Sequence, residues 1–162
     1  MTTEQLELTL SRIQDWIRAA DQKASIFLAL ILGSLAVGGN TLAEYIIYIF
    51  SVEQPLIVAL LLLSTVILTW SIMKTLFIIK PSVANNVKSF TYFGHIAQLS
   101  LDEFSDLISK VTNKKYSNEL LEQIHTSSKI ARKKHRQLAE AIKLFCIFLV
   151  LLTLTLWFTN VA

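Results

Sequence analysis

Cysteine, proline and glycine are all scarce in this sequence of 162 residues. The single cysteine, Cys146, lies in an apolar run, so the chain can form no internal disulfide and offers no cysteine cluster for zinc. Two prolines and four glycines leave few positions that would interrupt a helix. We therefore expect a chain that is mostly α-helical.

Charge is scarce as well, and it is unevenly placed. Charged residues make up 17% of the chain, against 53% hydrophobic residues and a mean hydropathy of +0.53. No Lys or Arg occurs between Lys23 and Lys74. These values predict a membrane protein with a modest soluble part. Three apolar stretches, at about 24–45, 56–79 and 144–160, are candidates for membrane spans.

Residues 1–23 carry charges at intervals too even for a secretory signal peptide. Apolar residues three or four apart continue from this segment into the first span: Leu6, Leu10, Ile13, Ile17, Ala20, Ala24, Phe27 and Ile31. This stripe predicts a cytosolic amphipathic helix that becomes a membrane helix without a break. Two endings fit the sequence: the helix stops at Gly38-Gly39-Asn40 and Thr41–Ser51 lies at the outer surface, or the helix continues to Phe50.

The second span is bracketed by the two prolines. Pro55 is expected at its start, and Pro81 stops the helix after Ile79. Lys74 lies about 8 Å inside that end. We expect its ammonium group to snorkel to the interface.

The distribution of positive charge predicts the orientation. Eleven of the fifteen Lys and Arg residues lie between Lys80 and Lys143, and three more precede the first span. The connection between the first two spans offers Glu44 and Glu53 and no cation. The positive-inside rule therefore places the N-terminus and residues 80–143 in the cytosol and the C-terminus outside.

Residues 80–143 form the only sizeable soluble segment. Ser100-Leu101-Asp102-Glu103 matches a capping box and predicts a helix start, whereas Asn85 to Gln98 fits either a helix or an extended approach. Thr112 to Asn118 is polar and predicts a turn. A last helix is expected to begin near Asn118 and to run without a breaker through the third span. Its buried stripe is predicted at Leu121, Ile124, Ser128, Ala131, His135, Leu138, Ile142 and Phe145.

These elements predict an all-α membrane protein with three transmembrane helices. Extensions of the first and third spans, together with the middle helical segment, are expected to form a small cytosolic bundle. The predicted parts are a cytosolic amphipathic helix (1–23), a transmembrane hairpin (24–79), a cytosolic helical region (80–143) and a third transmembrane helix (144–160).

Catalytic and metal-binding motifs are absent from the sequence. It has no phosphate-binding glycine-rich loop, no His-Glu-x-x-His and no nucleophile elbow. His95, His125 and His135 do not pair with cysteine or carboxylates at metal-ligand spacing. We therefore expect no enzyme, no catalytic residue, no metal site and no cofactor.

The strongest charge feature is the basic run from Lys129 to Arg136, in which Lys129, Arg132, Lys133 and Arg136 share one helical face. Counted from a span that starts near Leu144, Arg136 stands roughly 12 Å above the hydrocarbon edge and Lys129 roughly 22 Å. Arg136 can therefore reach lipid headgroups, whereas Lys129 and Arg132 are candidates for binding a phosphate or an acidic partner. The net charge of only +3 argues against double-stranded nucleic acid.

The entry of the first helix into the membrane carries Asp15, Arg18 and Asp21 at intervals of three, followed by Lys23. The spacing allows an ion pair along the helix face. Two interpretations are open: solvated charges that anchor the helix, or contacts from Arg18, Asp21 and Lys23 to the middle segment that couple it to the first span. Trp16 fits an interfacial aromatic or a core residue.

Hydroxyl groups dominate the polar residues of the predicted spans, and we expect them to bond to backbone or to neighbouring helices. They occur, with one asparagine, at Ser34, Asn40, Ser64, Thr65, Thr69, Ser71, Thr153 and Thr155. Ser25, Ala29 and Gly33 form a ridge of small residues that favours close approach of another helix. No ring of charges is available for an ion-selective filter, so a pore made by an oligomer should be weakly selective or gated by apolar side chains.

Three stretches stand out together: Trp16–Ser25 (WIRAADQKAS), Tyr92–Ala97 (YFGHIA) and Gln123–Ala131 (QIHTSSKIA) with the following Lys and Arg residues and Leu138. In order and placement they resemble the Pycsar transmembrane effector family of bacterial antiphage defence, over about Leu6 to Phe145. The resemblance implies a toxic protein of the bacterial inner membrane that stays silent until infection. It also implies abortive infection and activation through a cyclic pyrimidine mononucleotide, cCMP or cUMP. We expect such an effector to act as a homo-oligomer.

The soluble part is too short for a β-roll nucleotide-binding domain. A nucleotide would therefore bind among the cytosolic helices, near Tyr92, Phe93, Lys129 and Arg132, or a partner protein would do the sensing. Two functions remain open: a signal-gated effector that impairs the membrane, and an anchor or scaffold that holds a soluble partner and leaves the bilayer unaffected.

Overall fold

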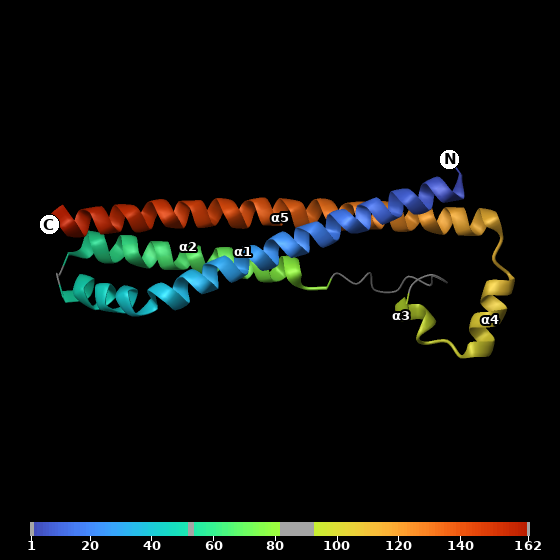
Figure 1. The fold of residues 1–162 in the computed structure, drawn as a ribbon, viewed down its shortest axis with the longest axis horizontal. Coiled ribbons are helices and arrows are strands. Elements are labelled where there is room, and N and C mark those ends of the chain that lie inside the picture. Colours follow the sequence, from blue (N-terminus) through green and yellow to red (C-terminus); the bar gives the residue numbers. More distant parts are fainter. Residues whose placement is uncertain (1, 52–53, 82–92, 162) are drawn as a thin grey trace. The chain divides into compact units, whose positions relative to one another are not determined.

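The computed structural model describes residues 2–51, 54–81 and 93–161, and all regular structure in these ranges is helical. The helices are, in chain order, α1 (Thr3–Ser51), α2 (Pro55–Ile79), α3 (Phe93–Ile96), α4 (Leu101–Ser109) and α5 (Asn113–Val161) (Figure 1). Of these, α1, α2 and α5 are each long and apolar enough to cross a membrane. The predicted all-α fold with three transmembrane helices is therefore confirmed.

At its start, α1 is held by a cap in which two side chains exchange hydrogen bonds with the backbone. Thr2 Oγ1 accepts from the Gln5 N–H (3.3 Å), and Gln5 Oε1 accepts from the Thr2 N–H (3.0 Å). This satisfies donors that a helix start leaves unpaired. The helix then passes through Gly38 and Gly39 to Ser51, so the earlier of the two expected endings is wrong. Glycine costs a helix only about 1 kcal/mol per residue, which a long apolar helix tolerates.

The bounds of α2 follow its prolines as predicted. Pro55 is the first helical residue, where a missing N–H has no helical partner to lose. The helix ends at Ile79, and the Lys80 N–H still bonds to the Leu76 carbonyl over 3.1 Å. Pro81 follows, and its ring cannot continue the helix.

The capping box at the start of α4 is confirmed. Ser100 Oγ accepts a hydrogen bond from the Glu103 N–H (3.3 Å), and Glu103 Oε2 accepts one from the Ser100 N–H (2.8 Å). Upstream of it, α3 is a single helical turn. Most of the segment that fitted either a helix or an extended approach lies outside the described residues.

The start of α5 lies at Asn113, so the turn expected between Thr112 and Asn118 is wrong. Thr112 caps the helix: its Oγ1 accepts from the Lys115 N–H (3.3 Å) and its carbonyl accepts from the Tyr116 N–H (2.9 Å). A polar stretch that follows a threonine cap fits the solvent-exposed first turn of a helix as well as it fits a loop. The helix then runs for 49 residues to Val161.

The chain divides into two compact units, and α1 and α5 each contribute to both. The first comprises residues 1–18 and 81–132, here called the head unit, and the second comprises residues 19–80 and 133–162, here called the membrane unit. In the head unit, Leu6 and Leu10 of α1 form a buried cluster with Leu120 of α5, and Tyr116 and Ile124 pack against it.

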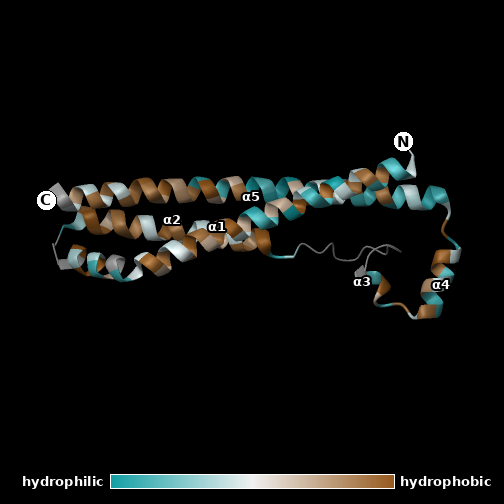
Figure 2. Cartoon of the chain, in the orientation of Figure 1, coloured by the Kyte–Doolittle hydropathy of each residue, from teal (hydrophilic) through white to brown (hydrophobic). Residues whose placement is uncertain are grey.

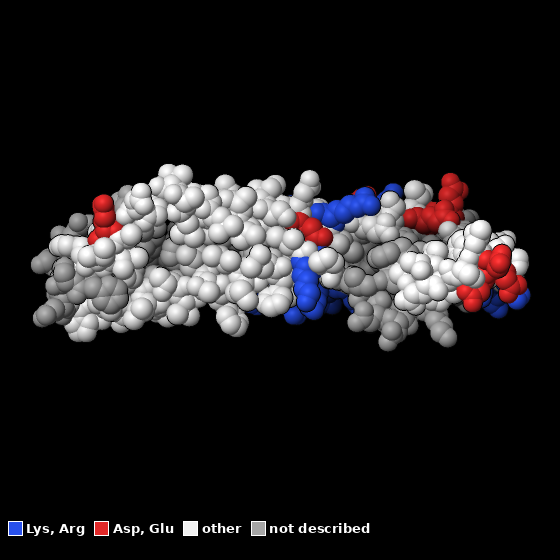
Figure 3. Space-filling view, turned by 90° about the horizontal axis from the view of Figure 1, so that it is seen from below, with Lys and Arg blue, Asp and Glu red and all other residues white. Residues whose placement is uncertain are grey.

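The membrane unit is apolar outside and has polar as well as apolar residues inside. Figure 2 shows hydrophobic residues predominating along α2, and Figure 3 shows few charged side chains over this unit. Large side chains of α2 are exposed, among them Leu62, Val66, Trp70 and Phe77, whereas its buried residues include Ser64, Ser71 and Thr75. Water would disfavour so large an apolar surface, but lipid solvates it and leaves small polar residues for the helix contacts. The chain is therefore a membrane protein.

The predicted stripe of α1 is confirmed, because all eight of its residues are buried or half-buried. The predicted stripe of α5 is wrong by one residue at several positions. Leu120 and Ala141 are buried, whereas Leu121 is 51% exposed and Ile142 42% exposed. Lys134, likewise, is more deeply buried than His135. The reason lies on the neighbouring helices, where partners for Lys134 and for the backbone at Ala141 are found.

Candidate functional site

An ion pair joins α1 to α5 inside the membrane unit. Lys134 Nζ donates to Asp21 Oδ1 over 2.5 Å, and the Lys134 side chain is only 6% exposed. One turn further along each helix, Ala24 and Leu138 share a buried cluster with Ile78 of α2, and the absence of a long side chain at Ala24 allows close approach. A buried ammonium group is tolerated only when it is paired. The Asp21–Lys134 contact is therefore a requirement of this packing.

A second ion pair joins α2 to α5. Lys74 Nζ donates to Glu140 Oε2, and Glu140 Oε1 lies 3.6 Å from Arg136 Nε. The Lys74 side chain is 30% exposed. That Lys74 snorkels to the interface stays a prediction; the structure adds that α5 brings a carboxylate close enough to satisfy its ammonium group.

A hydrogen bond extends this set of contacts by one residue along α5. Ser71 Oγ donates to the Ala141 backbone carbonyl over 2.9 Å, and neither residue has exposed surface. The other described hydroxyls of α2 bond within their own helix, as Ser64 does to Leu61 and Thr75 to Ser71. The expectation that intramembrane hydroxyls bond to backbone or to a neighbouring helix is confirmed. We call Asp21, Ser71, Lys74, Lys134 and Glu140 the polar clasp.

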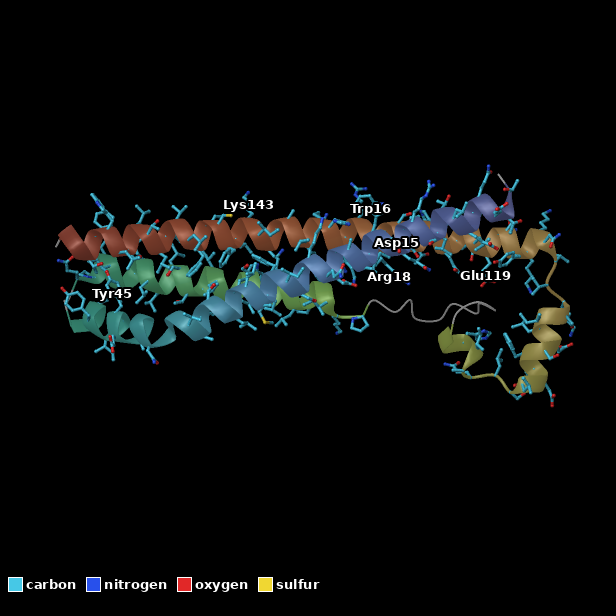
Figure 4. All side chains as sticks on the ribbon, in the orientation of Figure 1. Asp15, Trp16, Arg18, Tyr45, Glu119 and Lys143 are labelled. Carbon is cyan, nitrogen blue, oxygen red and sulfur yellow. The ribbon has the colours of Figure 1, made fainter. Side chains whose placement is uncertain are left out.

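The far end of the membrane unit has a polar contact of its own. The hydroxyls of Tyr45 on α1 and Thr159 on α5 form a hydrogen bond, and Tyr45 is labelled in Figure 4. Tyr45 also packs against a cluster of Ile49, Ile57 and Leu61, which joins α1 to α2. At this end a hydrogen bond thus ties α1 to α5, whereas apolar packing joins α1 to α2.

In the head unit, α1 and α5 meet through a polar contact beside their leucine cluster. The Tyr116 hydroxyl donates to Glu7 Oε1 over 2.7 Å. Asp15 and Arg18 form the ion pair expected from their spacing, at 3.5 Å. Both side chains are largely exposed, so this pair contributes at most about 1 kcal/mol.

Comparison with known proteins decides the family. The model of the Pycsar effector protein domain matches residues 5–159, which is nearly the whole chain. This chain belongs to the Pycsar effector family. It is thus an effector of bacterial antiphage defence, and the resemblance noted in the sequence is confirmed. No curated protein and no solved structure matches the chain.

The residues proposed to bind a ligand in this Pycsar effector are only partly described. Lys129 and Arg132 are exposed on α5 in the head unit. Tyr92 lies outside the described residues, and Phe93 is the first residue of α3. A site formed by these four residues stays a prediction.

The four residues proposed for coupling at the membrane entry have different surroundings. Asp21 pairs with Lys134, which lies within the cytosolic region predicted at 80–143, whereas Arg18 pairs with Asp15 on its own helix. Lys23 is exposed. Trp16 projects outward from α1 and is 60% exposed, so it is not a core residue of this chain (Figure 4).

Lys134 and Glu140 are the site residues that the sequence did not single out. A signal for Lys134 was present, because it continues the three-four spacing of Leu138, Ala141 and Phe145. Charged residues are rarely buried, so the sequence alone favours His135 at that position of the stripe. Only the neighbouring carboxylate of Asp21 makes Lys134 acceptable there.

Proposed function

We propose that this Pycsar effector is a non-enzymatic membrane protein that a cytosolic signal activates to impair the bacterial inner membrane, acting as a homo-oligomer. The observation that carries the proposal is the continuity of α1 and α5, each of which contributes residues to both the head unit and the membrane unit. A helix is a rod held by its own hydrogen bonds. A change in the head unit therefore has an unbroken path into the spans.

The activating signal in this proposal is a cyclic pyrimidine mononucleotide, cCMP or cUMP, bound at Tyr92, Phe93, Lys129 and Arg132 or delivered through a partner protein. The exposure of Lys129 and Arg132 supports it, because charge-assisted hydrogen bonds from such side chains suit a phosphate. The N-terminus and residues 80–143 would face the cytosol and the C-terminus the outside.

Oligomerisation is supported by the ridge of small residues on α1. Ser25, Ala29 and Gly33 are all exposed, and a Cβ added to Gly33 would meet nothing within 4 Å. Among the described residues, none therefore lies close enough to Gly33 to belong to the helix that is expected to pack on this ridge. A second copy would supply it.

The test is leakage of a dye from vesicles that contain the purified protein. Addition of cUMP or cCMP should start leakage, and the double variant Lys129→Ala/Arg132→Ala should raise the half-maximal nucleotide concentration at least about tenfold. The control variant Lys114→Ala/Lys115→Ala removes two exposed cations from the same helix and should leave the response unchanged. Absence of leakage with either nucleotide, and in cells during infection, would contradict the proposal.

A second function, an anchor for a soluble partner, is favoured by α4. None of its residues is buried, and Leu101 is 82% exposed and Ile108 44% exposed on an amphipathic helix. Such a face commonly serves as a binding surface for another protein. An anchor would retain that partner at the membrane and cause no leakage.

A further inference from the structure

The polar clasp concentrates its contacts on a short length of α5. Between Lys134 and Ala141, this helix receives one ion pair from α1 and an ion pair and a hydrogen bond from α2. All these residues belong to the membrane unit. Any movement of α5 along its neighbours must therefore break contacts to both of them.

The charges of the polar clasp are paired only when α5 has its observed position along α1 and α2. A displacement of α5 by one helical turn in either direction disrupts them. A slide of α5 by one turn, about 5.4 Å, exchanges each residue for one three or four positions away. Opposite Lys74, Glu140 would be exchanged for Arg136 or Gln137 in one direction and for Lys143 or Leu144 in the other. In both directions Lys74 loses its carboxylate and a cation comes near, which is unfavourable.

The same slide leaves Asp21 without a cation. Lys134 would be exchanged for Ile130 or Ala131 in one direction and for Gln137 or Leu138 in the other. A buried or half-buried carboxylate that loses its partner is strongly destabilised. Asp21 therefore disfavours both displacements independently of Lys74.

The remaining contacts discriminate less between registers. Ser71 donates to a backbone carbonyl, and every residue of α5 offers one. Ala24 and Leu138 share a buried cluster with Ile78, and a slide in one direction would bring Ala141 or Ile142 to the place of Leu138, both apolar. A slide in the other direction would bring Lys134 or His135, so this packing opposes only one of the two displacements. Apolar surface is satisfied by any apolar neighbour. The register is thus specified by the charges.

We propose that the polar clasp is a register lock, which holds α5 at one position along α1 and α2 in the resting protein and must open before the membrane is impaired. The link between opening of the lock and membrane impairment rests on the proposed function. The lock itself rests on the charge pattern. Buried ion pairs add little net stability compared with apolar residues of the same volume, but they discriminate strongly against wrong pairings. Discrimination against wrong pairings, without a large gain in stability, suits a contact that holds one register and can still be opened by a signal.

The first experiment measures register directly and does not depend on membrane damage. In a Cys146→Ser background, Ala24→Cys is combined with Leu138→Cys, which lies in the same buried cluster, or with Ile142→Cys, one turn further along α5. Oxidative cross-linking should favour the 24–138 pair. Removing both ion pairs with Lys134→Met/Glu140→Gln should shift cross-linking towards a displaced pair, whereas Lys133→Met, which changes an exposed neighbouring cation, should not. An unchanged preference for the 24–138 pair in the Lys134→Met/Glu140→Gln protein overturns the lock.

The second experiment measures leakage without any signal. Asp21→Lys and Lys134→Asp, each alone, should raise basal leakage at least about tenfold. The double variant Asp21→Lys/Lys134→Asp restores an opposite-charge pair and should return leakage towards wild type, which a folding defect in either single variant would not do. A double variant as leaky as the singles overturns the lock. Cross-links that shift without any leakage leave the lock standing and count against the proposed function instead.

Discussion

At the scale of single residues, ammonium groups show how this protein places charge near a membrane. Lys134 is nearly buried and relies on Asp21, whereas Lys74 is one-third exposed and shares Glu140 with Arg136. Both solutions take the partner from another helix. A lysine whose ammonium group reached water would not require a carboxylate on a neighbouring helix.

Leu120 and its neighbour Leu121 provide a matched pair for a test at this scale. Leu120 is 4% exposed in the leucine cluster of the head unit, and Leu121 is 51% exposed. Leu120→Ala should lower the free energy of unfolding of the head unit by about 2–3 kcal/mol, because it removes apolar burial and leaves a cavity. Leu121→Ala should change it by less than about 0.5 kcal/mol.

Amide hydrogen exchange of α5 near Tyr116, measured in detergent micelles, reports this difference. Variants in Leu6, which belongs to the same cluster, should resemble Leu120→Ala. Equal effects of Leu120→Ala and Leu121→Ala would show that the buried face of α5 is assigned wrongly.

At the scale of secondary-structure elements, α4 depends on its cap because none of its residues is buried. The pKa of Glu103 is held below its ordinary value of 4.5 by the hydrogen bonds that its carboxylate accepts from the backbone and hydroxyl of Ser100. The ionised carboxylate is therefore the form that caps the helix. Its stabilising effect is complete above the unfolded pKa, near 4.5, and is lost as the pH falls through the lowered folded pKa.

We therefore expect the start of α4 to open at acidic pH. The backbone amide of Glu103, followed by NMR in micelles, should titrate with an apparent pKa below 4.5. Glu103→Gln keeps an acceptor oxygen but cannot ionise, so this transition should vanish, and Ser100→Ala should speed amide exchange in α4 about fivefold. A wild-type transition at or above 4.5 would contradict the capping role.

The continuity of α1 is the second feature at this scale, and a proline tests it. Gln22 is exposed, so Gln22→Pro breaks the helix without removing a buried side chain. The expected result is normal abundance in the membrane but loss of signal-dependent leakage, whereas the control Gln22→Ala should behave as wild type. Leakage that persists at the wild-type level in Gln22→Pro would show that α1 does not transmit the signal.

At the scale of the whole molecule, hydropathy and charge are segregated along the chain. The spans expose large apolar side chains such as Val37 (90%) and Leu30 (64%), while eleven of the fifteen Lys and Arg residues lie between Lys80 and Lys143. The first feature makes the chain a membrane protein. The second predicts which side of the membrane each connection occupies.

Labelling of single cysteines with a membrane-impermeant maleimide tests that orientation. Since Cys146 is the only native cysteine, Cys146→Ser provides an unlabelled background. A cysteine introduced by Glu44→Cys should react in intact cells, and one introduced by Ser105→Cys should react only after the cells are opened. The reverse pattern would invert the predicted topology.

The sequence by itself determined the elements of this protein. Hydropathy defined the spans, proline and capping residues set the bounds of α2 and the start of α4, and the stripe from Leu6 to Ile31 identified the buried face of α1. These features are local, because propensity and periodicity act within one helix. The family followed from motifs in the same sequence.

Tertiary structure decided which of two adjacent residues on α5 is buried and which charges are paired. Lys134 rather than His135 lies deepest because Asp21 is opposite, and Ala141 rather than Ile142 is buried where Ser71 reaches the backbone. These outcomes depend on side chains more than sixty residues away in the sequence. A helical stripe cannot reveal such partners, because burial of a polar group is permitted only by the neighbour that satisfies it.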